Sequence, residues 1–239
     1  MSVHYKHKWP VMRALTRFWS QDRGLSIVLA LLLVSIFVLP PFIRPGSGRS
    51  GLGDVFFALL LIAGVRALFA RKFARWVLMP VTAITVSVDL ASWIVPVPQA
   101  WVQMATLTSL LLLLAIILVQ TFRGGPITTH RIMGGVAAYL LLGVIWAEAY
   151  TLVEIVHPGS FHGSLNVADG PRAWLYFSYI TLATVGYGDV LPIHPVARSL
   201  ATLEAVTGSL YLTILLARLV TLATLKEEGR DGENGDSYR

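Results

Sequence analysis

The sequence predicts an all-α membrane protein with six transmembrane helices, and three observations support this prediction. Of the 239 residues, 55% are hydrophobic and only 13% are charged, whereas soluble domains carry about 25% charged residues. Long apolar runs recur along the chain, each close to the roughly 20 residues that a spanning helix needs. Most of the cationic residues lie between these runs. We therefore assign the net charge of +6 to orientation in the lipid bilayer and not to nucleic-acid binding.

The composition also bears on chemistry. The chain has no cysteine, so disulfides and thiolate metal sites are excluded. No zinc-protease, P-loop or dinucleotide-binding glycine pattern occurs, so we expect neither an enzyme nor an organic cofactor. The basic N-terminus leads into an apolar run that we expect to be retained and not cleaved as a signal peptide.

The N-terminal segment, residues 1–24, is polar and basic and is expected to be cytoplasmic. Arg13 and Arg17 fall on one helical face, with Trp9 and Trp19 interleaved among the charges. This pattern is typical of a short helix that lies in the membrane interface. A solvated tail with aromatic anchors is the alternative.

Four apolar runs then predict a four-helix domain over residues 25–123. The runs cover 25–43, 54–70, 77–95 and 101–122. Prolines end the first and third runs, and arginines punctuate the loops after the second and fourth. Each run has about the length of one membrane-spanning helix.

Two further apolar runs, 131–156 and 195–225, flank a segment that is too short to cross the membrane twice. We expect this segment to be a re-entrant half-helix over 172–183 followed by extended backbone over 184–189. Irregular backbone at membrane depth is tolerated only where protein or a water-filled cavity surrounds it. The Gly- and acid-rich residues 226–239 are expected to form a disordered cytoplasmic tail.

The distribution of Lys and Arg predicts the orientation of these helices. With the N-terminus inside, fifteen of the 19 cationic residues fall on inner segments and four on outer ones. The outer ones are Arg44, Arg49, Arg172 and Arg198. An excess of positive charge marks the cytoplasmic side. We therefore expect a multi-pass protein of the cytoplasmic membrane with both termini in the cytoplasm.

Residues 184–189 read Thr-Val-Gly-Tyr-Gly-Asp. Two glycines that flank a tyrosine let the backbone adopt conformations that other residues avoid. Such a strand can aim several consecutive carbonyl groups in one direction. Rings of carbonyls from four copies of the loop can replace the hydration shell of a potassium ion. The chain holds a single copy, so four subunits would be needed to close the ring.

Residues 184–189 resemble the selectivity filter of potassium channels. Around them, residues 131–225 resemble the two-helix pore domain of bacterial six-transmembrane-helix channels of the voltage-gated-like superfamily. The resemblance implies a fourfold-symmetric homotetramer, potassium ions in the filter, and passive potassium conduction. It also implies an outer helix over 131–156, a pore helix over 172–183 and an inner helix over 195–225. The residues implied to bind the ions or to permit the filter backbone are Thr184, Val185, Gly186, Tyr187 and Gly188.

The resemblance also implies residues that support the filter. Asp189 would lie at the outer mouth, where many relatives bond this Asp to a pore-helix tryptophan. Tyr176 stands at the matching position and can donate through its hydroxyl, whereas the neighbouring Phe177 cannot donate. Thr181 is expected to back the filter from the pore helix, through the Tyr187 hydroxyl.

Three residues are candidates for gating. Gly208 falls where relatives have an inner-helix hinge glycine, and a close helix–helix contact is the equally weighted alternative. Glu148 and Glu204 are ionisable residues inside the membrane, which are costly and therefore suggest a function. Glu204 is expected to bond Ser178 or Thr181 at the back of the pore helix, and Glu148 to face the same region. Structural hydrogen bonding and the sensing of protons or potassium stay open for both.

The sixth apolar run carries a further apolar face. Leu212, Leu216 and Val220 share one side of the expected helix. They are expected to line the central cavity or a hydrophobic inner gate. Packing against the fifth helix is the alternative for each of them.

The fourth apolar run, 101–122, carries no Lys or Arg. Voltage sensors need about 3–4 gating charges per subunit. Asp89 resembles the acidic partner in the third helix of a voltage sensor, but its basic partners are missing. We therefore expect a sensor-like domain without a sensor, and gating by another stimulus, with any ligand or regulatory subunit unknown.

Two other classes of function remain as alternatives. The first is the pore subunit of a potassium transporter, a class that usually carries four degenerate filter loops in one chain. The second is a non-conducting interaction or sensor protein built on a channel scaffold. Such a protein would be expected to have lost the filter motif. The intact single motif favours the channel over both.

Overall fold

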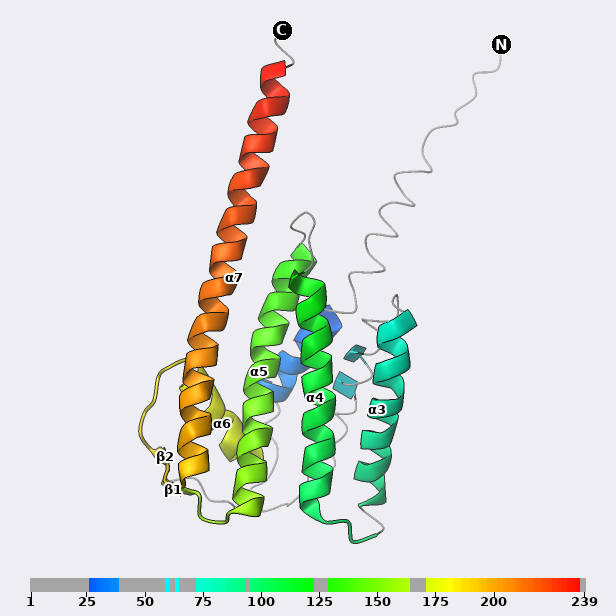
Figure 1. The fold of residues 1–239 in the computed structure, drawn as a ribbon, viewed down its shortest axis with the longest axis vertical. Helices are drawn as coiled ribbons and strands as arrows, with labels where there is room; N and C mark the ends of the chain where they lie inside the picture. The colour runs from blue at the N-terminus through cyan, green and yellow to red at the C-terminus, as the bar shows by residue number, and fades with distance from the viewer. Residues whose placement is uncertain are drawn as a thin grey trace, which may run out of the picture.

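The computed structural model describes residues 26–38, 59–60, 63–64, 72–92, 95–122, 129–163 and 171–236. Long helices lie side by side, and a short helix, α6, lies beside the part of α5 and α7 that is remote from the C-terminus (Figure 1). The labelled helices are α3 (Lys72–Ala91), α4 (Gln99–Phe122), α5 (Thr129–Val156), α6 (Pro171–Leu182) and α7 (Pro195–Asp236). The segment 26–38 is also helical and ends in one turn of π-helix, η1 (Val34–Val38).

Among the described residues, three helices are long and apolar enough to cross a membrane. They cover Gln99–Val119, Arg131–Val156 and Pro195–Thr221, and Ser26–Val38 is a shorter apolar helix. These three are the fourth, fifth and sixth of the expected spans, and α3 overlaps the third. Most of the runs 25–43 and 54–70, and all of residues 1–24, lie outside the described residues, so the number of six spans stays a prediction.

The main core lies between α4, α5 and the helix 26–38. Small residues on α5 let the neighbouring helices approach closely, as is common in membrane proteins. Leucine and isoleucine side chains of α4 then fill the space against them. The fully or nearly fully buried residues of this layer include Val28, Leu32, Leu110, Leu113, Ile117, Ala137, Ala138 and Leu141.

A second cluster of aromatic rings holds α6 against α5. Tyr150 of α5 lies 5.0 Å from Phe177 of α6 between ring centroids, and Phe161 lies 4.6 Å from Trp174. Both pairs have tilted or edge-to-face geometry, which aromatic pairs prefer over face-to-face stacking. The cluster fixes one side of α6, so that the other side faces α7.

The connection after α5 is tied to the chain that follows residue 189. The Glu154 carboxylate accepts hydrogen bonds from the backbone N–H groups of Gly159 and Ser160, at 2.7 and 3.0 Å. The next residues form β1 (Phe161–Gly163), which pairs antiparallel with β2 (Val190–Pro192). The short sheet therefore joins the end of α5 to the segment between residue 189 and α7.

Proline begins both α6 and α7, as is common in the first turn of a helix. His194 precedes α7, and its Nδ1 accepts a hydrogen bond from the Val196 N–H at 3.3 Å. The backbone of α7 then stays helical as far as Asp236, in contrast to the disordered tail expected over 226–239. Lys226 and the two glutamates after it favour helix, and no proline follows Pro195, so nothing in the sequence stops the helix sharply at 225.

Candidate functional site

The segment 184–189 leaves the end of α6 with an unusual backbone. The angle φ is 56° at Thr184, 53° at Gly186 and 79° at Gly188. Thr184 is the one non-glycine residue with positive φ in the described part of the chain. Positive φ thus recurs at every second residue. Alternation between left-handed and right-handed backbone conformations turns successive N–H groups to one side of the chain. The carbonyl groups are then turned to the opposite side.

The first three N–H groups of this segment donate to the end of α6. Val185 and Gly186 both donate to the Ile180 carbonyl, at 2.8 and 3.1 Å, and Thr184 donates to the Thr181 carbonyl at 2.9 Å. Among the residues that the structure describes, none donates a hydrogen bond to the carbonyl oxygens of 184–188. These oxygens are therefore available to bind a cation.

The expected bond at the end of the segment is present. The Tyr176 hydroxyl of α6 donates to Oδ2 of Asp189 at 2.8 Å. This hydrogen bond raises the pKa of the Tyr176 phenol above its ordinary value, because losing the proton would break the bond and place two negative charges side by side. Asp189 is therefore tied to α6 by a side chain.

Gly163 lies close behind Asp189 and was not among the sequence candidates. A Cβ atom at Gly163 would lie 2.0 Å from the Asp189 carbonyl oxygen, so only glycine allows β1 to approach the backbone here. Its φ of 140° is also one that other residues rarely adopt. No local pattern marks this glycine, because its constraint comes from a residue far along the chain.

Thr181 is partly buried, and its backbone carbonyl is the acceptor for Thr184. The expected link from Thr181 to the Tyr187 hydroxyl is not formed within the described chain. The Tyr187 side chain is instead 71% exposed. Its hydroxyl therefore points away from the packed part of this subunit.

Glu204 of α7 is completely buried behind α6. Its Oε1 lies 2.5 Å from Ser178 Oγ of α6, and its other oxygen accepts a hydrogen bond from the Tyr150 hydroxyl of α5. Ser178 Oγ also lies 2.7 Å from the Gly143 carbonyl of α5. The carboxyl group thus joins three helices. The sequence suggested Ser178 or Thr181 as its partner, and the structure shows Ser178.

Glu148 does not face the same region, in contrast to the expectation. It accepts a hydrogen bond from Gln103 Nε2 of α4, and the same nitrogen lies 3.1 Å from the Glu148 carbonyl oxygen. Residues two apart on a helix differ by about 200° in direction. Because Tyr150 points toward Glu204, Glu148 is turned to the opposite side of α5, where α4 lies.

Gly208 marks a close approach between α7 and the end of α6. A Cβ atom there would lie 2.3 Å from the Leu182 carbonyl oxygen and 2.9 Å from a Leu182 methyl carbon. Of the two interpretations of this glycine, the close contact is therefore present, although the partner is α6. A hinge at Gly208 stays a prediction.

Further contacts of the site were not predicted. Gly143 of α5 lies under the Tyr179 ring, where a Cβ atom would be 2.4 Å from Tyr179 Cε1. The Tyr179 hydroxyl donates to the Leu140 carbonyl at 2.6 Å. A buried hydroxyl needs a hydrogen-bond partner, so a partner for Tyr179 could have been expected from the sequence. Its identity could not be predicted.

No group of three or more His, Cys, Asp or Glu side chains suited to a metal ion occurs in the part of the chain that the structure describes. The acceptors that the site offers a cation are the backbone carbonyls of 184–188. Such oxygens suit a hard cation and do not favour transition metals.

The chain is similar to known proteins over part of its length. Residues 138–224, which include most of α5 and all of α6, match the family model described as "Ion channel". The inward rectifier potassium channel Kirbac3.1 of Paramagnetospirillum magnetotacticum is 38% identical over 80 residues, which cover 32% of this chain and 24% of that protein. The two pore potassium channel c of Oryza sativa subsp. japonica is 33% identical over 84 residues, which cover 35% and 17%. These matches support a potassium channel family.

The matches span a quarter or less of each of these potassium channels. No solved structure matches the chain significantly. Together with the three candidate spans, the family model points to a multi-pass membrane protein that is a channel and not an enzyme.

Proposed function

We propose that the chain is one subunit of a homotetrameric channel that conducts potassium passively and selectively. Residues 184–188 form its selectivity filter, α6 its pore helix and α7 its inner helix. Four copies of 184–188 surround one axis and supply rings of carbonyl oxygens in place of water. The channel lies in the cell membrane with both termini in the cytoplasm. Its gating does not depend on a charged fourth helix that senses voltage.

The observation that carries this proposal is the backbone of the proposed filter. Positive φ at Thr184, Gly186 and Gly188, and amides bonded to the end of α6, leave the carbonyl oxygens without partners in the described chain. Unpaired carbonyls at membrane depth are costly unless a cation or water meets them. A line of hydrated or ion-bound sites satisfies this requirement.

The tetramer is supported by the apolar surface of α7. Of the most apolar stretch of α7, only 11% is buried within one chain, whereas 50% of the corresponding stretch of α5 is buried. Leu212, Leu216 and Val220 are 46%, 64% and 55% exposed, so packing on α5 within the subunit does not account for them. We assign this face to contacts between subunits and to the wall of the central cavity.

The test is a planar-bilayer recording of the purified full chain, with potassium on one side and sodium on the other. Current that reverses near the potassium equilibrium potential, with an open probability that changes little with voltage, is the expected result. Reversal near zero would refute potassium selectivity, and steep voltage dependence would refute gating without a charged helix. Cross-linking followed by mass measurement tests the tetramer separately.

A further inference from the structure

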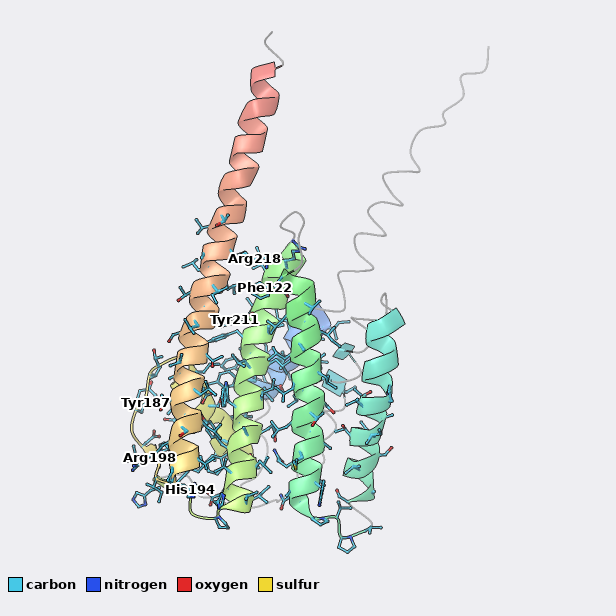
Figure 2. All side chains as sticks on the ribbon, viewed as in Figure 1. Phe122, Tyr187, His194, Arg198, Tyr211 and Arg218 are labelled. Atoms are coloured by element: carbon cyan, nitrogen blue, oxygen red, sulfur yellow. The ribbon has the colours of Figure 1, made fainter. Side chains whose placement is uncertain are left out.

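The buried carboxyl group of Glu204 belongs to a chain of three close contacts between oxygen atoms. Its Oε1 lies 2.5 Å from Ser178 Oγ, and its other oxygen lies against the Tyr150 hydroxyl. Ser178 Oγ in turn lies 2.7 Å from the Gly143 carbonyl oxygen. Figure 2 shows the side chains of α5, α6 and α7 crowded together in the part of the molecule that holds Tyr187. Oxygen atoms this close need a proton between them.

The number of protons available decides the charge of this chain. A serine or tyrosine hydroxyl has one proton to donate, whereas a carbonyl oxygen can only accept. The Tyr150 proton fills the contact with Glu204. Ser178 then has one proton for two acceptors, the Gly143 carbonyl and Glu204. If Glu204 were ionised, one of these two contacts would join two oxygen atoms without a proton between them.

A proton on Oε1 of Glu204 completes the chain. Glu204 then donates to Ser178, Ser178 donates to the Gly143 carbonyl, and Tyr150 donates to the second carboxyl oxygen. Each contact has its own proton, and no net charge remains among the three helices. The Gly143 carbonyl can accept this bond beside the one inside α5, because a carbonyl oxygen has two lone pairs.

No positive charge offsets an ionised Glu204 among the residues that the structure describes. The polar groups acting on its carboxyl group there are Ser178 and Tyr150. The other titratable side chains that interact with it are Tyr139 of α5 and Tyr179 of α6, which cannot supply a positive charge. Burying an unpaired charge is costly, so a carboxyl group in such surroundings is favoured in its neutral form.

We propose that Glu204 binds a proton and, as a neutral carboxylic acid, is the hydrogen-bond donor that holds Ser178 behind α6. Glu204 has no exposed surface, and the same is true of Ser178 and Tyr150. The carboxyl group is therefore a binding site for a single proton between three helices. The inference depends on the packing of α5, α6 and α7 and does not depend on ion conduction.

Loss of this proton would change the helix to which Ser178 donates. An ionised Glu204 attracts the single Ser178 proton, since hydrogen bonds to a charged acceptor are stronger than those to a neutral one. Ser178 would then donate to α7 and give up its bond to the Gly143 carbonyl of α5. The proton therefore decides whether this tie between α6 and α5 is present. If α6 is the pore helix, as proposed above, the attachment of that helix depends on a proton.

The test is infrared spectroscopy of the purified full chain in lipid bilayers. A protonated carboxyl group has a C=O stretching band at a higher frequency than a carboxylate. We expect this band in the wild type at neutral pH, its loss in alkaline solution, and its absence from Glu204→Gln, which keeps a donor and an acceptor in place. Glu148→Gln is the matched control, because it removes another carboxyl group within the span of α5 and should leave the Glu204 band unchanged.

Ser178→Ala tests the partner of the bound proton. The substitution removes the acceptor of the Glu204 hydroxyl, so the band should shift to a higher frequency. Equal absorption by the wild type and Glu204→Gln would overturn the proposal, and so would a band that Ser178→Ala leaves at its original frequency. If Glu204→Gln fails to assemble, the shift in Ser178→Ala assigns the band by itself. The assay measures no ion flux, so its failure and a failure of the proposed channel function are separate results.

Discussion

Ser178 Oγ and Glu204 Oε1 lie 2.5 Å apart, and both side chains are fully buried although they belong to different helices. The pair fixes the back of α6 to α7, and Tyr150 adds α5 through the second carboxyl oxygen. Buried polar groups are stabilising when all their partners are present and costly when one is removed. The orientation of the proposed pore helix therefore depends on this small network.

Replacing Glu204 should separate its structural role from a sensing role. Glu204→Leu leaves the buried Tyr150 hydroxyl without this acceptor, at a cost of about 1–3 kcal/mol, whereas Ser178 can still donate to the Gly143 carbonyl. We expect a lower midpoint of thermal unfolding and loss of the tetramer on size-exclusion chromatography. Glu204→Gln keeps an acceptor and a donor and should retain the tetramer. A pH dependence of open probability that is flattened in Glu204→Gln would contradict a purely structural role.

Gly208→Ala should disturb the end of the proposed pore helix. The new methyl group would meet the Leu182 carbonyl oxygen at 2.3 Å, and backbone cannot give way as a flexible side chain can. Overpacking of this kind costs about 1–3 kcal/mol, so we expect a lower thermal midpoint together with reduced potassium current. Ser209→Ala, at the neighbouring exposed position, is the control. If Gly208→Ala unfolds at the wild-type temperature and alters only gating, the glycine acts as a hinge.

Gly186→Ala should abolish potassium flux while leaving assembly largely intact. Within the described residues of one chain, a Cβ atom at this position meets no atom within 4 Å, so the constraint that one subunit imposes is the φ of 53°. A positive φ costs a non-glycine residue about 1–2 kcal/mol, which the backbone relieves by rotating and moving the carbonyl groups. Flux is measured with potassium-loaded vesicles.

Gly159→Ala is a matched control for that experiment. Gly159 has a φ of 81° and equally open space around its Cα, but it lies in the turn after α5. It should show a similar loss of stability with flux retained. Normal flux through Gly186→Ala would refute the assignment of the filter.

Tyr176→Phe should weaken the outer end of the proposed filter without unfolding the protein. The substitution removes the hydrogen bond to Asp189 and keeps the packing of the ring, because only the hydroxyl group is lost. We expect potassium current to decline faster during sustained opening. Tyr176→Trp restores an N–H donor and should slow the decline again. Equal decay in Tyr176→Phe and the wild type would show that this bond does not hold the filter.

The same bond predicts a response to alkaline pH. Because the bond to Asp189 raises the pKa of the Tyr176 phenol, the bond is complete at lower pH and is lost as the pH rises through that raised pKa. Faster decline of the current should therefore appear only at strongly alkaline external pH. Tyr176→Phe, which has no proton to lose, should not show this change, and an alkaline effect of equal size in Tyr176→Phe would assign it to another group.

Much of the fold could be predicted because its signals are local. The apolar runs at 131–156 and 195–225 and the prolines around them predict α5, α6 and the start of α7, whose observed bounds at these points lie within two residues of the expected ones. The glycines at 186 and 188 likewise predict an unusual backbone from their own chemistry. In each case the cause lies within a few residues of the effect.

The partners across helices could be predicted only in part. Glu204 was expected to bond Ser178 or Thr181, and Ser178 is the partner that the structure shows, whereas the second partner, Tyr150, was not predicted. The predicted direction of the Glu148 side chain was wrong, because that direction depends on which side of α5 faces α4. The proximity of Gly163 to the Asp189 carbonyl was not predicted at all.

The sequence by itself therefore predicted a membrane protein and the starts of α5, α6 and α7 to within two residues. It also predicted that residues 184–188 bind an ion, which stays a prediction. The tertiary structure alone decided that Glu204 joins three helices, that Gly208 lies against the Leu182 carbonyl, and that Arg218 of α7 donates to the Phe122 carbonyl of α4. Periodicity and turn chemistry act along the chain and can be read from it. Packing joins residues whose separation in sequence has no fixed relation to their distance in space, so only the folded chain defines those contacts.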